Sequence, residues 1–484
     1  YEAQAPVGAG GAPSGGQVSQ PTGPGPGVAA NTVPPQDQPK SNSRLAGLGD
    51  KSDPKNHFMV TGKLLRLGFE ISEKEIQLEK LSISENVHLV ETKIEKPDDE
   101  PIVIDGTEIR AVKLNTEQSE MSILGRPAHF AGRGMALSGT NINVHRGTNQ
   151  IWIGGAGQMD MKVEKGFDGE PLDSPLVVRW RDSMQFNGLE AVFKDNVVAM
   201  LPNSRLETPL LKVTLDRRVK LDGIDSLAEN DPALQRPGVK EDPQARLVEC
   251  SGGVFMEHHR FKGIVQLSRE RIGVDNLTID LATNQITSKG QGWLTSVRRG
   301  SDRNVIGSPD DSSSVMQSIA GDSNDDTKFT YSHMRFHDRL EGNLDRNIVT
   351  VYGQIQCTYG PVNSWEETID DTNPERLPPR TVLMSCRQMT IAEVPGIIDD
   401  NRSLELIALG NTVVDGNTFT ARADRMSYDQ SKDLLILEGT DRTDAVLYRQ
   451  PYVGGPQSKT PARKIFFSPN TNHVRIDSLR SSNI

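Results

Sequence analysis

Short runs of alternating apolar and polar residues cover the chain from His57 to its end. Clear examples are Ile76-Gln77-Leu78, Val87-His88-Leu89-Val90, Ile102-Val103-Ile104 and Leu435-Ile436-Leu437. A period of two along the chain indicates strands that bury one face. No segment carries a sustained i, i+3, i+4, i+7 stripe, so we expect a chain that is nearly all β. Residues 227–235 and 365–371 are weak helical candidates, expected as short decorations on loops.

Residues 1–56 have a different composition. The first 40 residues contain eight Gly and eight Pro and almost no large apolar side chains. Such a segment buries too little apolar surface to offset the entropy of ordering. We therefore predict a disordered Gly/Pro-rich linker over 1–56, which tethers the β region.

Two long polar insertions divide the β region. Residues 221–245 and 300–327 are rich in Pro, Asp and Ser, and long loops of this kind mark boundaries or exposed insertions. We expect β segments over 57–220, 246–300 and 328–484, with the middle one continuing the same stack. A third insertion is expected from about Tyr359 to Pro379.

A repeated unit of strand, polar turn, strand and glycine recurs along the chain. The clearest copies span 142–154, 277–290, 334–353 and 426–439, and weaker copies span 111–125 and 465–476. The turns are rich in Asn, Asp, Gly, Thr and Lys, as tight connections require. A single hairpin cannot bury its apolar face alone, whereas stacked hairpins bury theirs between opposed sheets. The repeat predicts a stack of similar hairpins.

One copy of the repeat carries a resemblance to a known family. The pattern G-N-T-V-V, then A-R-A-D-R-M-S-Y-D, then L-I-L-E-G within 410–439 resembles the OstA-like repeat of lipopolysaccharide-transport proteins. Residues 196–215 resemble a degenerate second copy. The similarity is greatest over 400–480 and looser over 60–300.

This resemblance implies an open antiparallel β-jellyroll, or β-taco, in which two sheets form a V around an apolar seam. Members of the family bind acyl chains in the seam and join end to end through edge strands. It therefore implies non-catalytic binding and transport of a lipopolysaccharide-like glycolipid across the periplasm and cell envelope. Other envelope transport proteins would be partners by edge-strand pairing, and no cofactor is implied.

The inward positions of the predicted strands are mostly aliphatic, which suits acyl chains because these need no directional polar partner. Each buried CH₂ contributes roughly 0.8 kcal/mol. The predicted groove residues are Ile142, Val144, Ile151, Ile153, Leu277, Ile279, Ile286, Val413, Phe419, Ala421, Met426, Tyr428, Leu435, Leu437 and Ile465.

The net charge and the hydropathy of the chain argue against nucleic-acid binding and against a membrane-spanning helix. The chain has 54 Lys plus Arg and 65 Asp plus Glu, a net charge of −11, which argues against a nucleic-acid partner. No apolar run approaches the roughly 18 residues of a membrane span. The chain opens at Tyr1 without an initiator Met, so we expect the soluble part of a longer protein, with room for a signal or membrane anchor upstream.

Catalytic and metal sites find little support in the sequence. Glu257-His258-His259 and the pair His333 and His337 lack the arrangement of a chelating site, since strand residues four apart lie about 13 Å apart. The acidic pairs Asp424 with Asp429 and Asp441 with Asp444 are typical of turns. Ser251-Gly252-Gly253 is predicted to be a turn. We expect no enzyme activity and no metal.

Cysteine, tryptophan and arginine positions leave alternatives open. Cys250, Cys357 and Cys386 are expected as buried fillers or free thiols, although a bridge from Cys357 to Cys386 stays open if their segments pair. The four tryptophans, Trp152, Trp180, Trp293 and Trp365, are expected as core or sheet-edge anchors rather than a carbohydrate platform. Basic pairs such as Arg298-Arg299 either face solvent or meet anionic headgroups.

Two other functions compete with lipid transport. A packed β-solenoid scaffold or spacer of the envelope would fill its seam with its own side chains. A polysaccharide-acting enzyme on a β-helix would need an acidic cluster on one face, which the sequence does not show. A continuous apolar cavity is what separates the lipid carrier from the scaffold.

Overall fold

The computed structural model describes residues 58–477 with gaps at 72–75, 93–99, 114–117, 133, 146, 163–171, 173, 219–243, 300–328, 373–376, 379–380, 396–401, 417, 453, 470 and 472. The chain divides into two units, 1–53 and 54–484, and every described residue belongs to the second. The predicted linker and the helical candidate at 227–235 lie outside the described residues. The described residues form antiparallel strands with one 3-10 turn, so the all-β prediction is confirmed.

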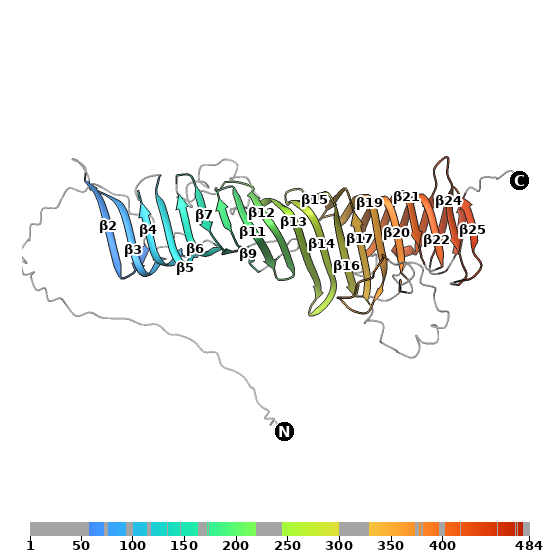
Figure 1. Ribbon diagram of the computed structural model, residues 1–484, viewed down its shortest axis with the longest axis horizontal. Helices are drawn as coiled ribbons and strands as arrows, with labels where there is room; N and C mark the ends of the chain where they lie inside the picture. Colours follow the sequence, from blue (N-terminus) through green and yellow to red (C-terminus); the bar gives the residue numbers. More distant parts are fainter. Residues whose placement is uncertain are drawn as a thin grey trace, which may run out of the picture. The chain divides into compact units, whose positions relative to one another are not determined.

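The described residues form 27 strands, which belong to one hydrogen-bonded sheet and follow one another in chain order, from blue to red in Figure 1. The strands are β1 (Phe58–Thr61), β2 (Leu64–Ile71), β3 (Ile76–Glu91), β4 (Val103–Val112), β5 (Glu120–Gly132), β6 (Met135–His145), β7 (Gln150–Gly154), β8 (Gly157–Met161), β9 (Leu176–Trp180), β10 (Ser183–Phe186), β11 (Glu190–Leu201), β12 (Ser204–Leu215), β13 (Ala245–Lys262), β14 (Val265–Asp280), β15 (Gln285–Lys289), β16 (Gly292–Arg299), β17 (Phe329–Phe336), β18 (Arg339–Asn343), β19 (Ile348–Val362), β20 (Val382–Pro395), β21 (Arg402–Asp415), β22 (Phe419–Asp429), β23 (Leu434–Glu438), β24 (Ala445–Arg449), β25 (Ser458–Ala462), β26 (Lys464–Ser468) and β27 (His473–Asp477).

At several places in this stack two short strands, placed end to end, occupy the position of one long strand. β7 pairs with one half of β6 and β8 with the other half, and β10 and β9 divide β11 in the same way. β1 and β2 share β3, β15 and β16 share β14, and β18 and β17 share β19. Each pair of short strands therefore replaces one long strand that has broken at its middle.

The long strands bend near their middles at register shifts. The shifts in β3, β11, β13, β19 and β21 coincide with two consecutive residues at positive φ: Glu85-Asn86, Asp195-Asn196, Gly252-Gly253, Gly353-Gln354 and Gly410-Asn411. A β-bulge adds a residue to one strand and increases its local bend. Gly and Asn adopt the left-handed conformation at low cost. The prediction of a turn at Gly252-Gly253 is wrong, because these residues are a bulge inside β13.

The predicted hairpins are formed, with one exception. Across their turns Ile142 pairs with Ile153, Ile279 with Ile286, Met426 with Leu437 and Ile465 with Ile476. The copy at 334–353 is different. The hairpin at this position is formed by β18 and β19, which pair through Asn343 and Ile348 next to the turn. Met334 lies on the preceding strand β17 and pairs with Cys357, farther from the turn.

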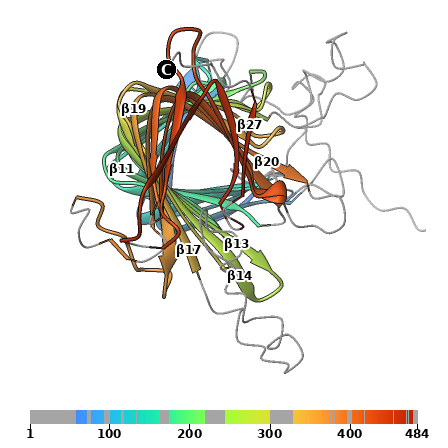
Figure 2. The same ribbon diagram turned by 90° about the vertical axis from the view of Figure 1, so that its right-hand side faces the viewer.

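The sheet continues across both long insertions. β12 pairs with β13 on either side of 219–243, and β16 pairs with β17 on either side of 300–328. Viewed along the stack, the strands surround a central region (Figure 2). One apolar cluster, which extends from Ile83 on β3 to Phe467 on β26, fills it. Within the described residues no helix has the length and apolarity needed to cross a membrane.

A second, smaller cluster lies on the opposite face of β16, β17 and β19. It contains Val297, Phe329, Tyr331 and Val362 together with Ile369 from the segment after β19. We call residues 363–372 the cover segment. The helical candidate at 365–371 is wrong, because this segment forms turns and irregular backbone. The acidic side chains there bond within turns or to the sheet instead of supporting a helix.

Candidate functional site

The predicted groove residues lie in the central cluster, with one exception. The buried members are Ile142, Ile151, Ile153, Leu277, Ile279, Ile286, Phe419, Ala421, Met426, Tyr428, Leu435, Leu437 and Ile465, and Val144 packs against them half-buried. Val413 was assigned to the wrong face. The bulge at Gly410-Asn411 shifts the register by one residue, so Val414 is buried in the cluster and Val413 is on the other face of β21.

Side chains fill the centre of this seam. Ile153, Met426 and Leu437 are each 0% exposed. A cavity lined by Tyr359, Met384, Leu406 and Tyr428 among others has a volume of only ≈ 40 Å³. That volume matches about one water-sized group. An acyl chain would therefore enter the centre only if the opposed strands moved apart.

The margins of the seam are more accessible. Half-buried apolar residues pack against the central cluster along its length, among them Met121, Phe130, Met256, Ile272 and Leu294. On the same face of β13, β14 and β16, the rows beyond Met256 and Ile272 become polar: His258, Glu270, Ser296 and Arg298. The Nη2 of Arg298 donates to Oε1 of Glu270 at 3.2 Å. The apolar centre of the seam and its polar rim therefore lie on the same face of these three strands.

The two ends of the seam differ. On β2, Leu65, Leu67 and Phe69 are 57%, 46% and 54% exposed, and Leu65 pairs with Ile83 of the buried face. At the other end Phe467 is 2% exposed and contacts Phe419, with ring centroids 5.1 Å apart. The apolar surface is therefore open at β2, whereas at the other end it is buried at Phe467 and only Ile476 on β27, which is 36% exposed, continues it.

The edge strands at these ends also differ. Among the described strands β2 pairs with β3 alone, and its exposed apolar side chains accompany a backbone edge with no described partner strand. At the other end β25 pairs only with β24 and β27 only with β26 among the described strands, but β25 carries Lys459 and Pro461, and β27 carries Arg475 and Asp477. Lysine and proline on an edge strand discourage further pairing. The edge at β2 is thus the more favourable one for a partner strand.

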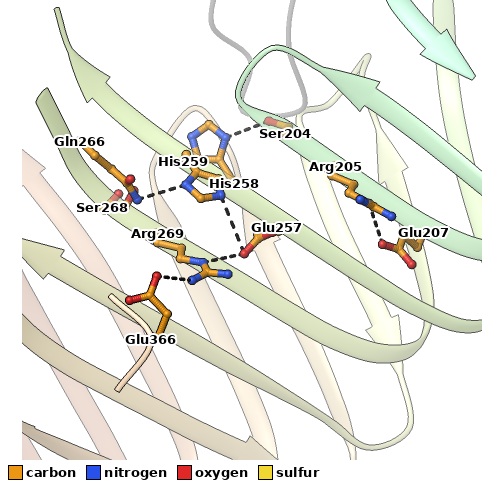
Figure 3. A network of polar contacts seen from close by, with 10 residues as sticks. All are labelled: Ser204, Arg205, Glu207, Glu257, His258, His259, Gln266, Ser268, Arg269 and Glu366. Atoms are coloured by element: carbon orange, nitrogen blue, oxygen red, sulfur yellow. Dashed lines mark hydrogen bonds and ion pairs between the residues drawn. The ribbon is translucent and has the colours of Figure 1, made fainter. Parts of the chain in front are cut away.

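A polar network occupies the projecting hairpin of β13 and β14 (Figure 3). Arg269 donates through Nε to Oε1 of Glu257 at 2.6 Å, and its Nη1 lies 3.7 Å from Oε1 of Glu366 in the cover segment. His259 Nε2 is 3.8 Å from the same Glu257 oxygen. The network ties the cover segment to the hairpin, and Arg269 neutralises the Glu257 carboxylate.

The adjacent histidines point to opposite faces, as neighbours on a strand must. His258 bonds through Nδ1 to Ser204 Oγ at 2.8 Å, whereas His259 Nδ1 meets Gln266 at 3.1 Å. His333 lies beside the cover segment, where burial and the charge of Arg335 lower its pKa. In the part of the chain that the structure describes, no three His, Cys, Asp or Glu side chains gather as a metal site requires.

The cysteines are free thiols in the structure. In the strand register Cys386 faces Ile355 and Cys357 faces Met384, so no bridge joins Cys357 to Cys386. Burial raises the pKa of Cys250, Cys357 and Cys386 to about 12. Their thiols are therefore protonated and unreactive at neutral pH.

The tryptophans have three different environments. Trp180 belongs to the central cluster, and Trp365 packs on the second cluster, as anchors would. Trp152 is 38% exposed on β7 and Trp293 is half-buried on the outer face of β16. The first two positions agree with the anchor prediction. The ring of Trp293 lies beside Phe255, Gly273 and His333 of three other strands, and no local sequence pattern indicates these neighbours.

Neither a scan against protein-family models nor a search of curated proteins returns a match.

Proposed function

We propose that this chain is a non-catalytic carrier of amphipathic lipid in the periplasm or cell envelope, with lipopolysaccharide-like glycolipid as its substrate. The observation that carries the proposal is the aliphatic seam that extends from Ile83 to Phe467 and is exposed at β2. The resemblance of residues 410–439 to the OstA-like repeat supports the same reading, as does an antiparallel stack that a β-jellyroll would require.

In this proposal the acyl chains enter at the open end, where Leu65, Leu67 and Phe69 already face solvent. Each CH₂ that leaves water contributes roughly 0.8 kcal/mol, which offsets the displacement of side chains that pack on one another. Headgroups remain in water at the polar rim, near Glu270 and Arg298. The unpaired edge of β2 receives a strand from another envelope transport protein.

A second function, a structural spacer of the envelope, is favoured by a separate observation. The centre of the seam is filled, with a cavity of only ≈ 40 Å³ beside Tyr428. A packed seam stabilises the stack without any ligand. The same experiment therefore decides between carrier and spacer.

The test uses the full chain with lipopolysaccharide and native mass spectrometry. The carrier predicts a bound glycolipid, and it predicts at least a tenfold loss of binding in Leu67→Asp, because the charge is placed on the open apolar face. Arg66→Asp is the matched control, since it places the same charge on the other face of β2 and retains binding. If the wild-type chain binds no lipopolysaccharide, the spacer is the better description.

A further inference from the structure

A groove of ≈ 650 Å³ lies on the outer side of the stack, and Val254, Val274 and Phe336 of the central cluster contribute to its lining. In strand register Phe255, Gly273, Trp293 and Arg335 form one row across β13, β14, β16 and β17. The neighbouring row, which includes Met256 and Leu294, packs on the central cluster instead. Adjacent strands are about 4.8 Å apart, so a groove across the six strands β11, β12, β13, β14, β16 and β17 is about 24 Å long.

Glycine makes this groove possible. A Cβ at Gly273 would collide with the indole of Trp293, so glycine there lets the ring lie against the strand backbone. Phe255 and His333 flank the ring, with centroids 6.2 Å and 6.1 Å from it. At Gly253 a Cβ would meet nothing within 4 Å, so the floor of the groove is open there. Trp293 is held rigidly beside an open floor.

Polar groups with unused hydrogen-bonding capacity line the same groove. Asn196, Asp275 and Gln291 are exposed, and within the described part of the chain their side chains make no hydrogen bond or ion pair. The indole N–H of Trp293 likewise donates to no described residue. Glu207, whose Oε1 is 2.6 Å from Nε of Arg205, adds a carboxylate at one end.

The lining excludes several classes of ligand. An added peptide strand needs a free backbone edge, whereas β12, β13, β14, β16 and β17 are each paired on both sides. Phosphate backbones would meet Glu207 and Asp275 on a chain of net charge −11. An acyl chain would leave these carboxylates and amides desolvated without partners.

We propose that this groove binds an extended oligosaccharide. A sugar ring presents apolar C–H faces and a rim of hydroxyls, which match an aromatic face surrounded by amide and carboxylate groups. One sugar stacks on Trp293, and its neighbours donate hydroxyls to Asp275 and Gln291. Trp293, Asp275 and Gln291 are not members of the central cluster, so the proposal does not rest on lipid binding in the seam.

The experiment measures binding of chitohexaose, cellohexaose and maltohexaose to the full chain by isothermal titration calorimetry and saturation-transfer NMR. We expect at least one sugar to bind, and Trp293→Ala to weaken it at least tenfold. Trp152→Ala is the matched control, because Trp152 is 38% exposed on β7 outside the groove. Asp275→Asn is a second variant, and its exposed side chain has no described partner whose loss would affect folding.

Failure to bind any of the three sugars overturns the proposal. Equal affinity of the wild-type chain and Trp293→Ala, with Asp275→Asn also unchanged, overturns it as well. Lipopolysaccharide binding through the seam is expected to be the same in Trp293→Ala, so the failure of one proposal is separable from that of the other.

Discussion

Asp371 is one of the groups that hold the cover segment to the sheet, together with Glu366 and the packing of Ile369, and its removal is expected to open this segment alone. Asp371 accepts from Nη2 of Arg335 at 2.8 Å and 2.7 Å, and from Oγ1 of Thr358 at 2.8 Å. The Asp371 side chain is 14% exposed, Arg335 is 41% exposed and Thr358 is 1% exposed. Asp371→Ala therefore leaves a buried hydroxyl without its partner.

The expected loss follows from these exposures. The ion pair with Arg335 is partly screened by solvent and contributes about 1 kcal/mol at most. The Thr358 hydroxyl, left buried and unpaired, costs about 1–3 kcal/mol. Together the change destabilises the closed cover segment by about 1–4 kcal/mol, which raises its open population roughly 5- to 1,000-fold.

Hydrogen exchange with mass spectrometry measures this opening. We expect faster exchange in 363–372 and at the outer face of β17, and a red shift of Trp365 fluorescence, since its ring lies 4.6 Å from that of Phe329. Exchange in β3 to β5 is expected to stay the same. Asp370→Ala is the control, because its carboxylate bonds to Thr372 in its own turn. Unchanged exchange over 363–372 in Asp371→Ala would refute the reasoning.

Three further predictions concern the packing of the seam, the bend in β19 and the buried thiols. Phe467→Ala, at a side chain 2% exposed, is expected to lower the free energy of unfolding by about 3–5 kcal/mol in a denaturant titration, whereas Phe466→Ala on the other face costs much less. Gly353→Ala combines φ +83° with a Cβ 2.6 Å from that of Asp338 and should cost at least about 2 kcal/mol, more than Gly454→Ala, where φ is +82° and nothing lies within 4 Å. Burial raises the folded-state pKa of the three thiols from 9.0 to about 12. The stability that the buried thiols contribute is therefore complete below pH 9 and is lost as the pH rises toward 12. Between pH 8 and pH 10.5 the melting temperature of the wild-type chain should fall more than that of a variant with all three cysteines replaced by alanine.

The sequence by itself determined the strands and most of their hairpin partners. Period-two alternation follows from burial of one face, and the turns at 147–149 and 281–284 are specified by residues that are local in the chain. The apolar character of the seam was determined at the same level, because inward positions such as Ile153 and Leu437 are buried whichever strands they meet.

Only the tertiary structure decided which irregular pairs are turns and which are bulges. Gly252-Gly253 and Gly410-Asn411 have the residues of a tight turn, because turns and bulges both require positive φ. The face of Val413 was therefore assigned wrongly, since one added residue reverses every side chain beyond it. The outer groove was likewise not predictable from local sequence. It is lined by Asn196, Trp293 and Arg335, which strand pairing brings together across two insertions, and no local pattern encodes that arrangement.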